Sequence, residues 1–272
     1  MLEKIANDAR IDIVKMIFEA KSGHPGGSLS CIDILIYLYQ NEINLTKDNL
    51  ETNQRNKLVL SKGHASPALY AALKSINVLT EQDIMTFRKI NSSLQGHPNM
   101  NDIAGVDMST GSLGQGISAA VGIALANKIK NNDYLTYVIC GDGEFEEGEV
   151  YEALMSAAHY NLNHLILFLD YNGLQIDGRV EDVIGPNPFK EKFLSFGWNA
   201  IEINGHNFSE IESAVEQAKK SQKPTAIIAH TIKGKGISYM ENQAGWHGKA
   251  PNQEELKKAL IELGGYDNGN SN

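Results

Sequence analysis

The fold is decided by residues 134–178, which read YLTYVICGDGEFEEGEVYEALMSAAHYNLNHLILFLDYNGLQIDG. Two runs of apolar and β-branched residues, Leu135 to Cys140 and Leu165 to Leu169, flank a helical pattern around Val150 to Tyr160. This order predicts a strand-helix-strand crossover, the repeating unit of a parallel sheet. Because ligands of such sheets bind at the carboxyl ends of the strands, the residues that follow each run are the first candidates for function.

Those residues combine a carboxylate, a carboxamide and a flexible backbone. Gly141 and Gly143 flank Asp142, and they lack the Cβ atoms that would keep a phosphate away from the main chain. Asn172 follows the second strand about one crossover later, and the turn after it directs the carbonyl of Leu174 toward the same edge. This set of oxygens suits a hard divalent cation that keeps a phosphate among its ligands. Two ordinary turns that cap buried strands are the simpler alternative.

The rest of the chain continues the alternation of strands and helices. Apolar residues at helical spacing from Ile5 to Ile17 predict a first helix, and a loop over Ser22 to Ser28 separates it from a second helical pattern. We therefore expect an α/β fold in which helices cover both faces of a parallel sheet. The expected strands are Lys57 to Leu60, Leu135 to Cys140, Leu165 to Asp170, Asn199 to Ile203 and Thr225 to His230. The further expected helices are Leu29 to Gln40, Pro67 to Ser75, Glu81 to Arg88, Leu113 to Ile129, Gly148 to Tyr160, Ser209 to Lys220 and Gln253 to Leu263.

The composition is that of a globular chain. With 272 residues and 42% hydrophobic content the chain can bury a full core, and we expect one domain over residues 1–266 and a polar, frayed tail over 267–272. The net charge of −9 argues against nucleic acid or an anionic membrane as a partner. Cys31 and Cys140 lie in apolar patterns and are expected to be buried free thiols. We see neither a signal peptide nor an apolar run long enough to span a membrane, which favours a cytoplasmic location.

Eight segments of the chain resemble, in the same order, segments of the transketolase family. GDG followed about one crossover later by an asparagine is similar to the thiamine diphosphate motif, and the other segments extend the resemblance over nearly the whole chain. They are SGHPGGSLS (22–30), LSKGHASPALYA (60–71), QGHP (95–98), DMSTGSLGQGIS (107–118), GDGEFEEGEVYEA (141–153), NGLQIDG (172–178), HTIKGKG (230–236) and WHGKAP (246–251). The resemblance implies the thiamine diphosphate-binding fold.

The resemblance also implies an activity and a partner. Members transfer a two-carbon ketol unit from a ketose phosphate to an aldose phosphate, as in the pentose phosphate pathway, with thiamine diphosphate as the electron sink. Mg²⁺ would hold the diphosphate, although Ca²⁺ and Mn²⁺ also accept oxygen ligands. Single-chain members carry two further domains, and this chain resembles only the first. We therefore expect a separate C-terminal transketolase subunit, an α2β2 heterotetramer, and activity only when both subunits are present.

The resemblance gives roles to four histidines. His24 and His97 would contact the hydroxyls of the sugar substrate. His64 would contact the diphosphate and the reaction centre, and His247 both diphosphate and substrate. His206 matches no position with a catalytic role, and we expect it to be structural. The remaining histidines lie inside or at the ends of expected elements and are expected to be core or edge residues: His159, His164 and His230.

The glycine-rich segment GSLGQG, residues 111–116, is assigned to the cofactor by the same resemblance. Its glycine pattern is GxxGxG and not the GxGxxG of dinucleotide sites, so we reject a nicotinamide site. Gly111, Ser112 and Leu113 would line the thiamine cofactor, with Leu113 and Ile176 packing on the thiazolium region. For Gly114 and Gly116 the close packing of a helix on the sheet is an alternative explanation.

The diphosphate and its metal would be held by residues around the crossover. Asp142, Asn172 and the carbonyl of Leu174 would bind the metal. The diphosphate would contact Gly143, Asn172, Lys233, His64 and His247. A solvated lysine remains an alternative for Lys233. Carboxylates that follow GDG are explained by the helix dipole. The exception is Glu147, which matches a buried family glutamate that links two cofactor sites across a dimer.

Other functions remain open. The chain would also suit a deoxyxylulose phosphate synthase-like enzyme, or a transketolase for an unusual sugar or sulfosugar. A polypeptide that has lost catalysis and serves as a scaffold is a third interpretation, and the intact set of Asp142, Asn172 and histidines argues against it. A nucleotide-binding module is the least favoured, because the chain has no P-loop sequence. The donor and acceptor sugars are not determined by these residues.

Overall fold

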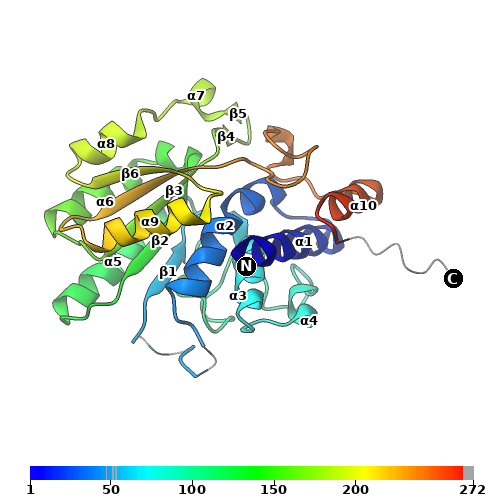
Figure 1. Ribbon diagram of the computed structural model, residues 1–272, viewed down its shortest axis with the longest axis horizontal. Coiled ribbons are helices and arrows are strands. Elements are labelled where there is room, and N and C mark those ends of the chain that lie inside the picture. The colour runs from blue at the N-terminus through cyan, green and yellow to red at the C-terminus, as the bar shows by residue number, and fades with distance from the viewer. Residues whose placement is uncertain (47, 51, 53, 266–272) are drawn as a thin grey trace.

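The computed structural model describes residues 1–265 except 47, 51 and 53, and in that part of the chain it contains a five-stranded parallel sheet (Figure 1). The strand order is β1-β2-β3-β7-β6. Because Thr136 pairs with Leu165 and Gly141 with Asp170, the carboxyl ends of β2 and β3 lie side by side. The strands are β1 (Lys57–Leu60), β2 (Thr136–Gly141), β3 (Leu165–Tyr171), β6 (Asn199–Asn204) and β7 (Thr225–His230).

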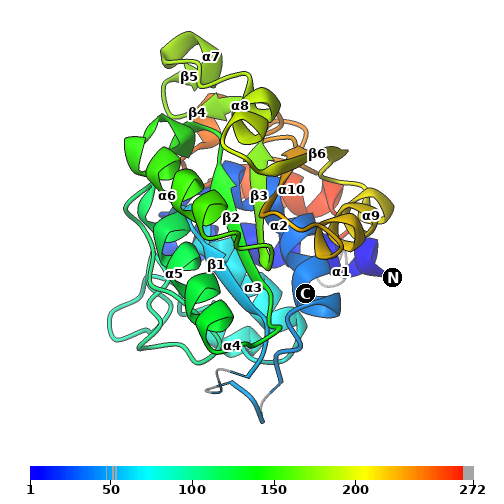
Figure 2. The same cartoon turned by 90° about the vertical axis from the view of Figure 1, so that its left-hand side faces the viewer.

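Helices cover both faces of the sheet (Figure 2). Successive side chains of a strand point to opposite faces, so Tyr137 and Ile139 belong to one apolar cluster and Val138 and Cys140 to the other. Helices α5, α6 and α8 pack in the cluster with Val138. Helices α2 and α9 pack in the other cluster, and α1 and α3 pack against α2. The helices are α1 (Leu2–Ala20), α2 (Pro25–Asn41), α3 (Ser66–Ser75), α5 (Gln115–Ile129), α6 (Gly148–His159), α8 (Phe189–Ser195), α9 (Phe208–Lys219) and α10 (Gln253–Glu262).

Short elements connect these layers. A two-stranded antiparallel hairpin, β4 (Leu174–Gln175) and β5 (Gly178–Arg179), follows β3. The remaining short helices are α4 (Glu81–Ile84) and α7 (Val180–Val183), with 3₁₀ turns η1 (Gly63–Ala65), η2 (Gly143–Glu146) and η3 (Ala244–Trp246). Within residues 1–265, leaving out 47, 51 and 53, no helix is long and apolar enough to cross a membrane.

The expected architecture is confirmed, with corrections at helix ends. Each expected strand is found to within one residue at either end. The expected loop over Ser22 to Ser28 is wrong in its second half, because α2 begins at Pro25, a residue whose fixed φ suits a first helical position. The helix expected to reach Arg88 ends at Ile84, and Arg88 itself has a positive φ of 58°. Helix α5 begins at Gln115 and not at Leu113, after the left-handed Gly114. The hairpin, α7 and α8 were not anticipated from the sequence, and the tail over 267–272 lies outside the described residues.

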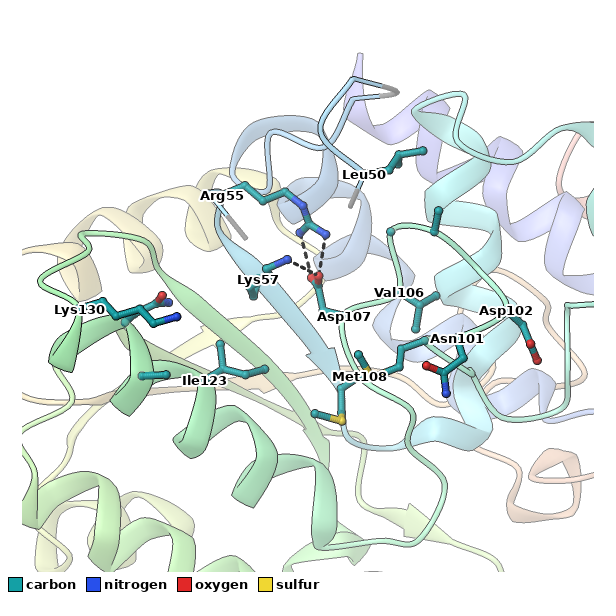
Figure 3. A pocket seen from close by; sticks show the side chains of 15 residues that line it. Leu50, Arg55, Lys57, Asn101, Asp102, Val106, Asp107, Met108, Ile123 and Lys130 are labelled. Atoms are coloured by element: carbon teal, nitrogen blue, oxygen red, sulfur yellow. Dashed lines mark hydrogen bonds and ion pairs between the residues drawn. The ribbon is translucent and has the colours of Figure 1, made fainter. Parts of the chain in front are cut away.

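A buried ion cluster attaches the segment before α5 to the edge strand β1 (Figure 3). Both oxygens of Asp107 accept hydrogen bonds from the guanidinium of Arg55, at 3.0 and 2.6 Å. Asp107 also lies 3.1 Å from the ammonium of Lys57 and accepts a bond from the backbone N–H of Leu58 at 2.9 Å. A cavity of about 660 Å³ adjoins this cluster beside the second half of α5. The buried charges of the ion cluster hold the segment before α5 to β1. The cluster lies away from the carboxyl ends of the strands.

We expect Asp107→Ala to lower the free energy of unfolding by about 3–5 kcal/mol, because it leaves the buried guanidinium of Arg55 without its carboxylate. Glu202→Ala is the matched control, since Glu202 pairs with Lys190 at the surface and such pairs are worth about 1 kcal/mol or less. Urea unfolding followed by circular dichroism measures both changes. Equal, small losses in the two variants would contradict the anchoring role of Asp107.

Candidate active site

A cavity of about 380 Å³ opens where the carboxyl ends of β1, β2 and β3 meet the start of α2 and the segment after β7. It brings together most of the residues that the sequence suggested. These are His24, His64, Gly111, Leu113, Asp142, Gly143, Glu147, Asn172, Leu174, Ile176, Lys233 and His247. Two suggested residues do not line it: Ser112 is exposed beside it, and His97 is an exposed side chain packed against Gly111.

Asp142 is a buried carboxylate held by the backbone. Its two oxygens accept hydrogen bonds from the N–H groups of Gly143 at 2.9 Å and Gly173 at 2.5 Å. Burial, and the nearby negative charge of Asp170, raise the pKa of Asp142 to about 6. A buried carboxylate whose charge is so disfavoured is a site that a bound cation would stabilise. Asn172 and Leu174 line the same cavity, and both carry oxygen atoms of the kind that a divalent metal accepts.

Lys233 is a buried residue and not a solvated one. Its ammonium donates to the Leu174 carbonyl at 3.0 Å and lies 3.1 Å from Nδ1 of His247. Burial, and the charge of Lys62, lower the pKa of Lys233 to about 8. The carbonyl that we assigned to the metal is thus already bonded to a cation of the protein.

A second buried lysine faces the cavity, and the sequence did not reveal it. Lys62, which follows β1, forms an ion pair with Asp170 near the end of β3 and donates to the Gly27 carbonyl at 2.9 Å. Asp170 also accepts bonds from the hydroxyls of Ser30 and Thr231, each at 2.5 Å. Burial opposes the ionisation of Asp170, but the charge and hydrogen bond of Lys62 hold its pKa below the usual value. Because these residues come from separate segments, only the fold brings them together.

Three histidines form a cluster on one wall of the cavity. The ring centroids of His24, His64 and His247 lie 5.1 to 5.3 Å apart. Burial, together with nearby cationic side chains, lowers the pKa of His24 to about 4 and that of His247 to about 3, and the pKa of His64 falls well below its usual value for the same reason. The rings are therefore neutral near pH 7, so each offers one donor and one acceptor nitrogen. The Nδ1 atom of His24 is buried without a hydrogen-bond partner among the described residues, which marks it for a ligand.

The acidic residues after GDG have different environments. Glu144 is buried, and its carboxylate accepts bonds from the N–H groups of Gly114 at 2.9 Å and Gly141 at 3.0 Å. The helix dipole therefore does not account for Glu144. The carboxylate of Glu144 instead joins the start of α5 to the end of β2. Glu147 lines the cavity but is exposed on this single chain. Ile176 lies at the rim with 67% of its surface exposed.

Two glycines of GSLGQG serve close packing. A Cβ atom on Gly116 would lie 2.5 Å from the hydroxyl of Ser61 and 2.6 Å from its Cα atom, so α5 packs directly on the end of β1. Gly114 has a φ of +82°, and a Cβ there would lie 2.9 Å from the side chain of Glu147. Packing of a helix on the sheet therefore explains Gly116, whereas Gly114 lies against Glu147 at the start of α6. Gly111 lines the cavity instead.

The histidines without an expected role lie elsewhere. His206 is mostly buried and bonded to Asp33, as expected of a structural residue. His159 and His230 are exposed at the ends of their elements, and His164 is half-buried, so none is a core residue. Cys31 and Cys140 are buried free thiols, as expected.

Comparison with known proteins connects this geometry to a family. The chain matches the model of the transketolase thiamine diphosphate-binding domain over residues 1–270. It is 43% identical over 263 residues to a 6-deoxy-6-sulfo-D-fructose transketolase subunit of Clostridium sp. (strain MSTE9), with 96% of each chain covered. It is 37% identical to an apulose-4-phosphate transketolase subunit of Phocaeicola vulgatus, over 96% of this chain and 93% of that relative. The structure resembles transketolase from Campylobacter jejuni with a TM-score of 0.89 and 37% identity, and the match spans 97% of this chain and 42% of that one.

We expect the histidine cluster to make stability depend on pH. The pKa of His24 falls from 6.5 to about 4 on folding, so between these values the unfolded chain binds more protons. The free energy of unfolding that depends on His24 is therefore highest above about pH 6.5, and it decreases as the pH falls toward 4. His24→Gln removes this proton uptake, so its free energy of unfolding should change less between pH 7 and 4 than that of the wild type, as measured by urea unfolding. Parallel curves for the two proteins would show that His24 does not titrate as described.

Proposed function

The chain belongs to the transketolase family, and on that premise we propose that it is the thiamine diphosphate-binding subunit of a two-subunit transketolase. It transfers a two-carbon ketol unit from a ketose phosphate to an aldose phosphate. The observation that carries this proposal is the meeting of Asp142, Asn172, Lys233 and the neutral histidine cluster in one cavity. Each of these side chains has the chemistry that a metal-bound diphosphate beside a sugar requires.

Residues at one end of the cavity would hold both the metal and the diphosphate. Asp142, Asn172 and the Leu174 carbonyl would hold a divalent cation, Mg²⁺ or its substitutes Ca²⁺ and Mn²⁺, since all three residues present oxygen atoms. Gly143 leaves the main chain open to a phosphate, and Lys233 supplies a positive charge. When bound, thiamine diphosphate supplies the electron sink for breaking and forming the carbon-carbon bond. Its ring would lie along Gly111, Ser112, Leu113 and Ile176.

The histidines would handle protons and orient the sugar. Because His24, His64 and His247 are neutral, each can donate a hydrogen bond to a substrate oxygen and accept one from a hydroxyl. Lys233 points its ammonium at Nδ1 of His247, which leaves Nε2 as the nitrogen that carries the proton. His97, outside the cavity beside Gly111, would meet the substrate from the solvent side.

A partner subunit would complete the enzyme. Two relatives that match this chain over nearly their whole length are each described as one subunit of a transketolase, which supports a separate C-terminal partner. We infer an α2β2 heterotetramer with one domain over residues 1–266 of this chain. Glu147, exposed here at the cavity rim, would be covered in that assembly and link two sites. The buried free thiols are compatible with a reducing cytoplasm.

Two classes of sugar are candidate substrates. The first class is the sugar phosphates of the pentose phosphate pathway, which are the general substrates of the family. A sulfosugar is the second, because the relative with 43% identity is described as a 6-deoxy-6-sulfo-D-fructose transketolase subunit. The two substrate classes differ in their terminal anionic group, so the same cavity floor would serve both.

We expect this chain, co-expressed with the polypeptide encoded beside its gene, to transfer ketol units from xylulose 5-phosphate or 6-deoxy-6-sulfofructose to an aldose phosphate. The reaction should require thiamine diphosphate, Mg²⁺ and both chains. Asp142→Ala should reduce the rate by more than about 100-fold, because even outer partners of a metal site are worth 10–100-fold. Asp182→Ala, on the exposed helix α7, is the matched control and should keep the wild-type rate.

Two outcomes would count against the proposal. Full activity of this chain without its partner would exclude the two-subunit enzyme. Calorimetry that shows no binding of thiamine diphosphate with Mg²⁺ to the assembled protein would exclude the catalytic function and favour a scaffold role.

A further inference from the structure

A buried cluster of Arg10, Asp33 and His206 lies outside the cavity and under the segment that carries Lys233. The cluster joins α1, α2 and the loop after β6. One oxygen of Asp33 accepts a hydrogen bond from the guanidinium of Arg10 at 2.5 Å and lies 2.6 Å from Nδ1 of His206. Their side chains are exposed by 9%, 5% and 12%, in the order named. Burying these charged groups costs desolvation free energy. Their contacts with the neighbouring backbone indicate what the cluster achieves.

The cluster contacts the backbone on both sides of Lys233. Before the lysine, the N–H group of Ile232 donates to Nε2 of His206 at 2.9 Å. After it, the Lys235 carbonyl accepts from Nε of Arg10 at 3.2 Å. Because Asp33 binds both side chains, one carboxylate fixes both attachment points.

These bonds define the protonation of the cluster. Nε2 of His206 accepts a bond and therefore carries no proton, so Nδ1 carries it and donates to Asp33. Burial disfavours the charge of Asp33, but the hydrogen bond of His206 and the charge of Arg10 hold the pKa of Asp33 below its usual value.

The segment around Lys233 needs such support. Gly234 and Gly236 both have positive φ, 80° and 94°, and glycines add conformational freedom that must be lost when the segment is fixed. The Gly234 N–H donates to the Gly26 carbonyl at 3.0 Å, which attaches the segment to the start of α2. The bonds of His206 and Arg10 attach it to the cluster. Between these supports, the ammonium of Lys233 reaches the Leu174 carbonyl and His247.

We propose that His206 is a positioning residue which, together with Asp33 and Arg10, fixes the backbone around Lys233 and so directs its ammonium group into the cavity. His206 touches neither cofactor nor substrate. Its effect on ligand binding passes through Ile232 to Lys233, and this part of the inference rests on the proposed function, in which Lys233 meets the diphosphate.

Amide hydrogen exchange tests the backbone role in the protein without cofactor. In His206→Ala we expect the Ile232 amide to exchange about 10-fold faster, because it loses its acceptor, while β2 and β3 keep their wild-type rates. His206→Gln retains an acceptor on its amide oxygen and should restore part of the protection. His159→Ala, which removes an exposed histidine, is the matched control. Unchanged exchange over residues 231–236 in His206→Ala, or an equal increase over the whole chain, would overturn the proposal.

Calorimetric titration of the assembled enzyme with thiamine diphosphate and Mg²⁺ tests the effect on the cavity. We expect His206→Ala to raise the Kd for the cofactor about 10-fold, in the range typical of outer partners of a binding site, and His206→Gln to recover part of the loss. Wild-type affinity in His206→Ala would refute the positioning role. If the wild type itself binds no cofactor, the proposed function fails instead, and the exchange experiment still decides whether His206 holds the segment.

Discussion

The ion pair between Lys62 and Asp170 is the interaction on which the site depends. Asp170 lies near the end of β3, and its carboxylate also binds hydroxyls from α2 and from the residue after β7. One buried charge therefore joins four segments that line or support the cavity. Because such a pair is stable only when both partners and their hydrogen bonds are in place, it requires the strands to end at the observed register. The positions of Asp142 and Asn172 follow from that register.

The fold was largely predictable because local signals and global topology agree. Strands β2 and β3 are largely apolar runs, as buried parallel strands should be, and the helix between them is amphipathic. The errors arose where glycine, proline or short loops decide the outcome. Pro25 begins a helix in a segment that reads as a loop, and the β4–β5 hairpin is too short to leave a periodic pattern.

The site was predictable only as far as sequence motifs reach. Motif residues such as Asp142, Asn172 and His64 do meet in the cavity, whereas Lys62 and Asp170 stand 108 positions apart, so neither signals the other in the sequence. The helix dipole does not account for Glu144, because its carboxylate accepts a bond from the N–H group of Gly114, 30 residues away, and that contact exists only when α5 is packed in place. The sequence also left open whether Lys233 is buried or solvated. The fold decides this, because it buries the side chain.

The strand order has a consequence for how the protein is made. β1 pairs with β2 across an intervening stretch that contains α3, α4 and α5, and β3 pairs with β7, which lies beyond β6 in the chain. Such non-local pairing is slow to form, because loops must close before contacts repay their entropy. The segment bearing Lys233 and His247 is also the last part of the cavity to leave the ribosome. The cavity therefore assembles after most of the chain has been synthesised, and until then unpaired strand edges need protection from aggregation.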